Sequence, residues 1–69
     1  NAMYYTVNDA GRILNITETT LRRWLNKYKV DVSVSPFGKV LITPQGMDDL
    51  RTIIAVNEKI RELEMSLLK

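Results

Sequence analysis

Cationic and hydrogen-bonding residues gather between positions 19 and 26, at spacings that place them on one side of a helix. Arginine can bond guanine or phosphate with two donors, and threonine and asparagine can bond base edges or backbone oxygens. Apolar residues at i, i+3, i+4 and i+7 mark the opposite side of that helix: Leu21, Trp24, Leu25 and Tyr28. The outward face therefore consists of Thr19, Arg22, Arg23 and Asn26. Residue types and spacing together predict a face that binds nucleic acid.

Two alternatives stand beside this interpretation. The two arginines could be ordinary solvated surface, and Trp24 could stack on an exposed base rather than pack inside the protein. The position of Trp24 in the apolar stripe favours packing in the core. Arg12 and Lys27 lie at the edges of the expected face and are candidate phosphate ligands, although Lys27 is also well placed to favour the end of a helix.

The composition excludes most catalytic and metal sites. The 69 residues include no cysteine and no histidine, which removes the usual zinc and iron–sulfur ligands, thiol chemistry and histidine-based catalysis. Asp48 and Asp49 do not make an acid/base dyad, because residues i and i+1 do not face one another on a helix. We expect no enzyme activity, no cofactor, no metal and no small-molecule effector.

Size and charge indicate one small domain. Residues 1–43 carry a net charge of +3 and residues 44–69 carry −1, so an anionic partner should meet the first part. No apolar run approaches the roughly 18 residues of a membrane span, and no secretory signal precedes the domain, so we expect a cytoplasmic protein without a membrane partner. We interpret residues 1–2 as a tag remnant and Met3 as the natural start.

Three threonines mark the expected helix starts. Thr6, Thr17 and Thr43 each follow an apolar residue and precede another one four positions later, which is the pattern of a helix cap with a hydrophobic staple. Asp9 stands in the reciprocal capping position after Thr6, and Pro44 stands at a first helical position. We predict helices over 7–14 and 18–28, and a third from residue 44 that could reach the C-terminus.

The connections complete the expected fold. The first helix should bury Val7, Ala10, Ile13 and Leu14. Asn15 can adopt the left-handed conformation that ends a helix, which leaves a tight turn before the second one. Residues 30–34 alternate, residues 35–38 are turn formers and residues 39–42 are apolar, so we expect a short hairpin with Gly38 at positive φ. A short helix, a tight turn and a cationic second helix are typical of domains that place a helix in the DNA major groove.

From Tyr5 to about Ile54, the chain resembles the MerR-like winged helix-turn-helix proteins, including excisionase-type and chromosome-anchoring relatives. The matching segments are Tyr5-Thr6-Val7, Arg12-Ile13-Leu14-Asn15-Ile16-Thr17, Thr20-Leu21-Arg22-Arg23-Trp24, Gly38, Leu50 and Ile53. The resemblance implies a mainly α, winged helix-turn-helix domain over residues 3–54, with a short β-hairpin wing and a long C-terminal helix. It also implies that Arg22 and Arg23 contact DNA. Lys39 stands beside Gly38 where many members carry arginine, which favours a phosphate contact by the wing over base readout.

The C-terminal segment, residues 55–69, predicts dimerisation. Ile53, Val56, Ile60, Leu63 and Leu67 follow at steps of 3 and 4, which is the seam of a coiled coil. The alternative is that this tail packs on its own domain. Family members commonly dimerise through a helix placed here, so we expect a homodimer held by Val56, Ile60, Leu63 and Leu67.

We therefore expect a dimeric transcriptional regulator that binds double-stranded DNA. One alternative keeps DNA binding in an architectural role, as a recombination factor or chromosome anchor. Another is a winged-helix module that binds protein and no nucleic acid.

Overall fold

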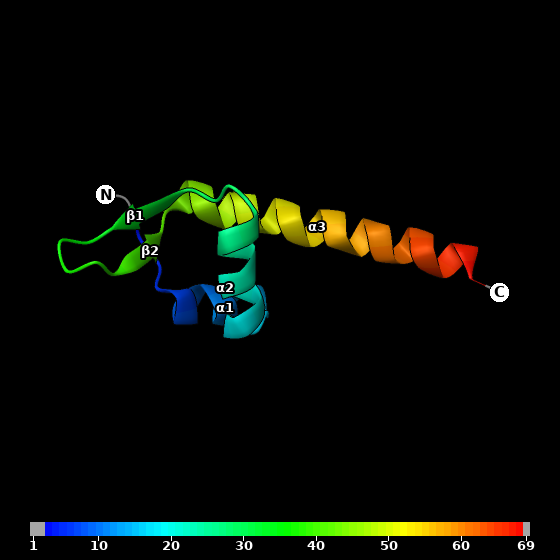
Figure 1. Ribbon diagram of the computed structural model, residues 1–69, viewed down its shortest axis with the longest axis horizontal. Helices are drawn as coiled ribbons and strands as arrows, with labels where there is room; N and C mark the ends of the chain where they lie inside the picture. The colour runs from blue at the N-terminus through cyan, green and yellow to red at the C-terminus, as the bar shows by residue number, and fades with distance from the viewer. Residues whose placement is uncertain (1–2, 69) are drawn as a thin grey trace.

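The computed structural model describes residues 3–68 (Figure 1). The proposed tag remnant at residues 1–2 lies outside the described residues, as does Lys69. The elements are three helices and a two-stranded sheet, in the order α1 (Val7–Leu14), α2 (Glu18–Lys27), β1 (Val32–Val34), β2 (Val40–Ile42) and α3 (Pro44–Leu67). A mainly helical chain with one antiparallel hairpin and a long C-terminal helix is thus confirmed.

Each helix begins at a threonine cap, as predicted. The hydroxyl oxygens of Thr6, Thr17 and Thr43 accept hydrogen bonds from the backbone N–H three residues later, at 3.0, 3.2 and 3.0 Å. The expected reciprocal bond to Asp9 is not among those of the described residues, because the Asp9 carboxylate accepts from Arg12 at 2.7 Å instead. The caps satisfy donors that the first turn of a helix leaves without an internal partner.

The turn between α1 and α2 is closed by Asn15 and Gly11. Asn15 adopts φ 58° and ψ 46°, the left-handed conformation expected of it. The next amide, of Ile16, donates to the Gly11 carbonyl at 2.9 Å, and a Cβ on Gly11 would lie only 2.9 Å from the Ile16 carbonyl oxygen. A residue without a side chain at Gly11 therefore lets the two helices follow one another closely.

The hairpin is shorter than expected and gains a neighbour. β1 and β2 pair Val32 with Ile42 and Val34 with Val40, whereas the sequence pattern extended to residues 30 and 39. Tyr5 also pairs with Ile42 through two backbone bonds, from Tyr5 N–H to the Ile42 carbonyl at 2.9 Å and in return at 2.7 Å. The segment before α1 is therefore fixed to β2, which holds the hairpin against the helices.

The core lies where α1, α2, β2 and the start of α3 meet. Its buried apolar members are Val7, Ala10, Leu21, Ile42, Met47 and Leu50. Trp24 is half-buried and packs against this cluster. Ile13 was expected inside and is 58% exposed. Six residues turn a helix by about 600°, so Ile13 lies about 120° around from Val7 and misses the core.

The start of α3 is fixed by a close approach to the loop before β1. A Cβ on Gly46 would overlap the Asp31 carbonyl oxygen, and the Thr43 hydroxyl donates to that same oxygen at 3.2 Å. The Asp49 carboxylate accepts from the Asp31 backbone N–H at 3.0 Å. These contacts set the direction in which α3 leaves the domain.

The C-terminal half of α3 extends away from the other elements (Figure 1), and the molecule measures 52 Å along its longest axis. The alternative that the tail packs on its own domain is therefore wrong. Within the part of the chain that the structure describes, no helix combines the length and apolarity needed to cross a membrane.

Candidate nucleic-acid interface

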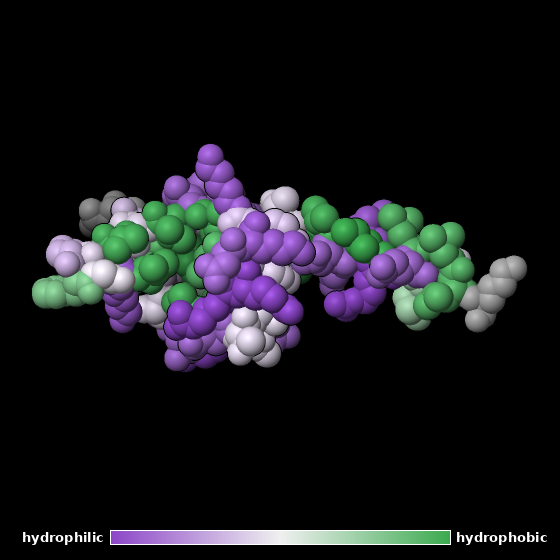
Figure 2. Space-filling view, in the orientation of Figure 1, coloured by the Kyte–Doolittle hydropathy of each residue, from purple (hydrophilic) through white to green (hydrophobic). Residues whose placement is uncertain are grey.

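The outward face of α2 is exposed in full. Thr19, Arg22, Arg23 and Asn26 are all exposed, while Leu21 on the opposite side is completely buried. The buried stripe fixes the rotation of the helix, and the threonine cap fixes its start. Figure 2 shows hydrophilic side chains gathered over the α1–α2 part of the molecule, whereas hydrophobic ones cover much of the hairpin and the tail.

The α2 helix ends one residue earlier than predicted. Tyr28 has φ −113° and ψ 159° and caps the helix in extended conformation, with its N–H bonded to the Trp24 carbonyl at 2.8 Å. The apolar stripe continues past the last helical residue, which is why the pattern alone placed the end too far. The ammonium of Lys27 lies 5.3 Å from the centre of the Tyr28 ring, a favourable cation–π arrangement.

The two arginines of the face differ in their partners. Arg22 Nε donates a hydrogen bond to Glu18 Oε2 at 3.0 Å, and Arg22 Nη2 forms an ion pair with the same oxygen at 2.9 Å. The Arg22 side chain nevertheless remains 62% exposed. Among the described residues Arg23 makes no ion pair. Arg23 can therefore meet an anion directly, whereas Arg22 must exchange a carboxylate for it.

A similar pairing occurs on α1. Arg12 donates to Asp9 at 2.7 Å, and its side chain is 76% exposed. Exposed pairs of this kind contribute only about 0.2–1 kcal/mol, so a phosphate can compete with the carboxylate. Lys27 and Lys39 make no ion pair within residues 3–68.

Two grooves lie between the hairpin and α2. One has a volume of about 600 Å³ and is lined by Glu18 and Arg22 from α2, by Asn8 from α1, and by Gly38 and Lys39 from the hairpin loop. Another, of about 320 Å³, is lined by Val32 and Val40 from the hairpin and by Arg22 and Asn26 from α2. The fold therefore brings Arg22, Asn26 and Lys39 to a shared surface. Thr19, Arg23 and Lys27 line neither groove.

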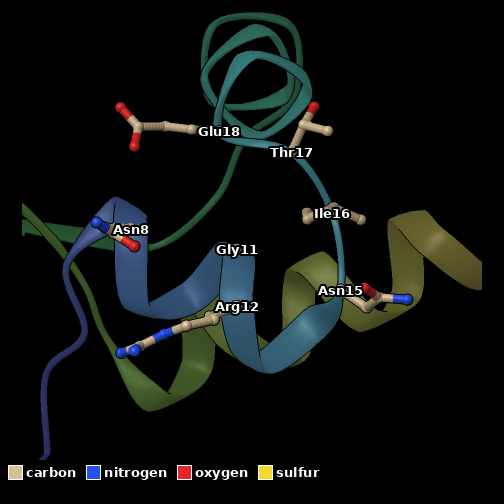
Figure 3. A pocket seen from close by; sticks show the side chains of 7 residues that line it. All are labelled: Asn8, Gly11, Arg12, Asn15, Ile16, Thr17 and Glu18. Atoms are coloured by element: carbon tan, nitrogen blue, oxygen red, sulfur yellow. The ribbon is translucent and has the colours of Figure 1, made fainter.

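A further hollow lies at the α1–α2 turn and has a volume of about 350 Å³ (Figure 3). Arg12 reaches its edge from α1 and Glu18 from the start of α2, with Gly11 between them. This is where the structure places Arg12, close to the first turn of α2. In the described part of the chain, no group of three or more acidic residues could hold a metal ion.

Sequence reasoning named neither Asn8 nor Glu18 as a site residue, although both line these hollows, and Glu18 is the charged one of the two. It borders both the turn hollow and the groove beside the hairpin. Its position four residues before Arg22 is the spacing at which a helix pairs opposite charges, and that spacing was the available signal.

The predicted dimer seam is exposed on α3. Val56, Ile60 and Leu63 are about half exposed, at 52%, 48% and 53%, and Leu67 is 81% exposed. Ile53 differs from the rest, because it packs against the core of its own domain. A seam of four residues along the protruding half of α3 is thus available for a partner.

No protein-family model matches the chain, and no curated protein or solved structure is similar enough to count as a match. The functional argument consequently rests on the residues and their geometry.

Proposed function

We propose that this chain is a winged helix-turn-helix domain that binds double-stranded DNA with α2 in the major groove. The observation that carries the proposal is the exposed face of α2, which presents two guanidinium groups, a hydroxyl and an amide opposite a buried apolar side. A major groove about 12 Å wide admits one helix. The hairpin would act as the wing.

The contacts can be assigned from the partners of each cation. Arg23 has no carboxylate partner among the described residues, so it bonds phosphate or guanine without exchange. Arg22 binds DNA by releasing Glu18. Lys39 approaches the flanking backbone from the hairpin, and Thr19 and Asn26 bond base edges or backbone oxygens. Arg12 and Lys27 extend the footprint on either side.

The proposal includes a homodimer through Val56, Ile60, Leu63 and Leu67. An isolated helix is marginally stable in water, and the protruding half of α3 exposes all four of these residues. A dimer would place two α2 helices on half-sites about 34 Å apart or a multiple of that. We propose a transcriptional regulator as the role, with an architectural DNA-binding protein as the alternative.

A specific observation supports one competing function. The groove between α2 and the hairpin is lined largely by apolar side chains: Val7, Leu25, Val30, Val32 and Val40. Such a surface suits an apolar protein segment better than it suits the charged backbone of a duplex. A protein-interaction module is therefore the second candidate.

Titration of duplex DNA at several salt concentrations distinguishes these functions. If each protomer neutralises about four phosphates, log K falls against log salt with a slope near −3.6 per protomer. Arg23→Ala should lower affinity without changing the unfolding midpoint, whereas Arg51→Ala, an exposed arginine on α3, is the matched control. Equal affinity of the parent, Arg22→Ala and Arg23→Ala would exclude this face as the site, and no binding at low salt would favour the protein-interaction module.

A further inference from the structure

The loop of the hairpin exposes an aromatic ring that the proposed contacts do not use. Phe37 is 96% exposed, the largest value among the big hydrophobic side chains of the described residues. Its loop connects β1 and β2 and lies at the end of the molecule opposite the C-terminal tail (Figure 1). Single exposed apolar residues are common on proteins, so exposure alone assigns no role to this ring.

Four hydrogen bonds connect the backbone of the loop. Ser35 N–H donates to the Lys39 carbonyl at 2.8 Å, and Gly38 N–H donates to the Ser35 carbonyl at 2.9 Å. The Ser35 hydroxyl accepts from the amides of Phe37 and Lys39 at 3.3 and 3.1 Å. The ring therefore projects from an ordered turn, and little backbone freedom is lost when it binds something.

The turn does not need an aromatic residue to form. Serine at the first position, proline at the second and glycine at the fourth are the favoured residues of a tight turn, and Ser35, Pro36 and Gly38 occupy them. Gly38 also supplies the positive φ of 80° that closes the loop. Phe37 fills the one position that these preferences leave open, and it packs on nothing that would explain a phenylalanine.

The surroundings of the ring point to nucleic acid. Lys39 follows two residues later, and together with Gly38 it lines the groove that also contains Arg22. If α2 occupies the major groove, this loop extends along the flanking backbone to the adjacent minor groove. Proteins that bind there insert apolar side chains between base pairs, with phenylalanine among those used.

We propose that Phe37 is a wedge that enters the minor groove, unstacks one base step beside the α2 site and kinks the duplex. This inference rests on the proposed function. Pyrimidine–purine steps unstack and kink most easily, so the wedge selects DNA by deformability at a position where Lys39 provides only charge. The same loop would thus contact DNA in two ways, with Lys39 on a phosphate and the Phe37 ring between two bases.

The test compares the parent chain with Phe37→Ala, Phe37→Leu and Val34→Ala. Val34→Ala is the matched control, because it removes an exposed apolar side chain, 61% exposed, from the strand that precedes the turn. The probes are duplexes of about 30 base pairs with either several TA steps or a rigid A-tract, carrying end labels for energy transfer and a 2-aminopurine at the flexible step. Affinity, end-to-end distance and 2-aminopurine fluorescence are measured for each variant.

We expect the parent to bind the flexible duplex, shorten its end-to-end distance and raise the 2-aminopurine signal. Phe37→Ala should abolish both signals and lower affinity by about tenfold, since burial of the ring is largely offset by unstacking. Phe37→Leu should retain part of the bend, and Val34→Ala all of it. If Phe37→Ala binds and bends DNA like the parent, the wedge is excluded while DNA binding stands. If the parent binds neither duplex at low salt, the proposed function fails and the wedge with it.

Discussion

Replacing Glu18 by glutamine should have opposite effects on folding and on DNA binding. The carboxylate bonds Arg22 four residues later, and both side chains are at least half exposed, at 50% and 62%. Exposed pairs at this spacing contribute about 0.3–0.5 kcal/mol. Glu18 is also an acidic residue in the first turn of α2, where the helix dipole adds about 0.3–1 kcal/mol. We therefore expect Glu18→Gln to lower the free energy of unfolding by about 1 kcal/mol.

The same substitution should strengthen DNA binding. It removes a negative charge from the proposed interface and frees the Arg22 guanidinium from its partner. The repulsion between a carboxylate and a phosphate about 4 Å away in water is about 1 kcal/mol. Its removal should raise affinity about fivefold at low salt. In the proposed complex Arg22 already contacts DNA in the parent, so the number of neutralised phosphates stays the same and the slope of log K against log salt should change by much less than about 0.9.

Urea unfolding and fluorescence anisotropy of a labelled duplex measure the two effects. The control is Asp48→Asn, which makes the same charge change on α3. It breaks the exposed ion pair between Asp48 Oδ1 and Arg51 Nη1, which are 3.1 Å apart. It should leave the affinity for the duplex unchanged. If Glu18→Gln weakens DNA binding at every salt concentration, the carboxylate itself accepts bonds from DNA or orients Arg22, and the reasoning is refuted.

Three other predictions test the fold and the assembly. Gly46→Ala places a methyl group on the Asp31 carbonyl and should cost about 1–3 kcal/mol or more; Gly38→Ala, where nothing lies within 4 Å of the added atom, should cost only the roughly 1–2 kcal/mol of its positive φ. Equal urea midpoints for the two variants would contradict the close approach at Gly46. Trp24→Ala should cost about 2–3 kcal/mol, less than the about 3–5 kcal/mol of a fully buried aromatic, because Trp24 is half-buried; a loss below about 0.5 kcal/mol would show that it does not support the core. Ile60→Asp combined with Leu63→Asp should halve the mass in sedimentation, whereas Glu58→Ala, on another side of α3, should not, and an unchanged mass in the double variant would exclude the seam.

Local signals in the sequence predicted most of this architecture. The threonine caps placed all three helix starts, and Asn15 has the left-handed conformation expected from its side chain. The exposed face of α2 followed from the spacing of its apolar residues. Each of these features depends on interactions within a few residues, which is the range that a pattern can report.

Contacts between distant segments could not be predicted in the same way. The pairing of Tyr5 with Ile42 and the approach of Gly46 to Asp31 depend on how elements pack after they form. Ile13 was wrongly predicted to be buried. Only one side of α1 faces the core, and the apolar pattern of a helix with two turns is too short to define that side well. The Glu18–Arg22 pair is different, because its spacing of four residues was a local signal that could have predicted it.

The continuity of α3 has a consequence for spacing on DNA. The helix runs from the domain core through the exposed seam, with no glycine or proline after Gly46 to act as a hinge. In a dimer, the rotation of each DNA-binding domain about the axis of α3 would be set by the number of residues between the core and the seam. One residue inserted after Ala55 would rotate the domain by about 100° and move it by about 1.5 Å. Seven inserted residues would nearly restore its angle. The length of α3 between the core and the seam would then determine the spacing of the two DNA half-sites, and each inserted residue would change that spacing by a fixed step.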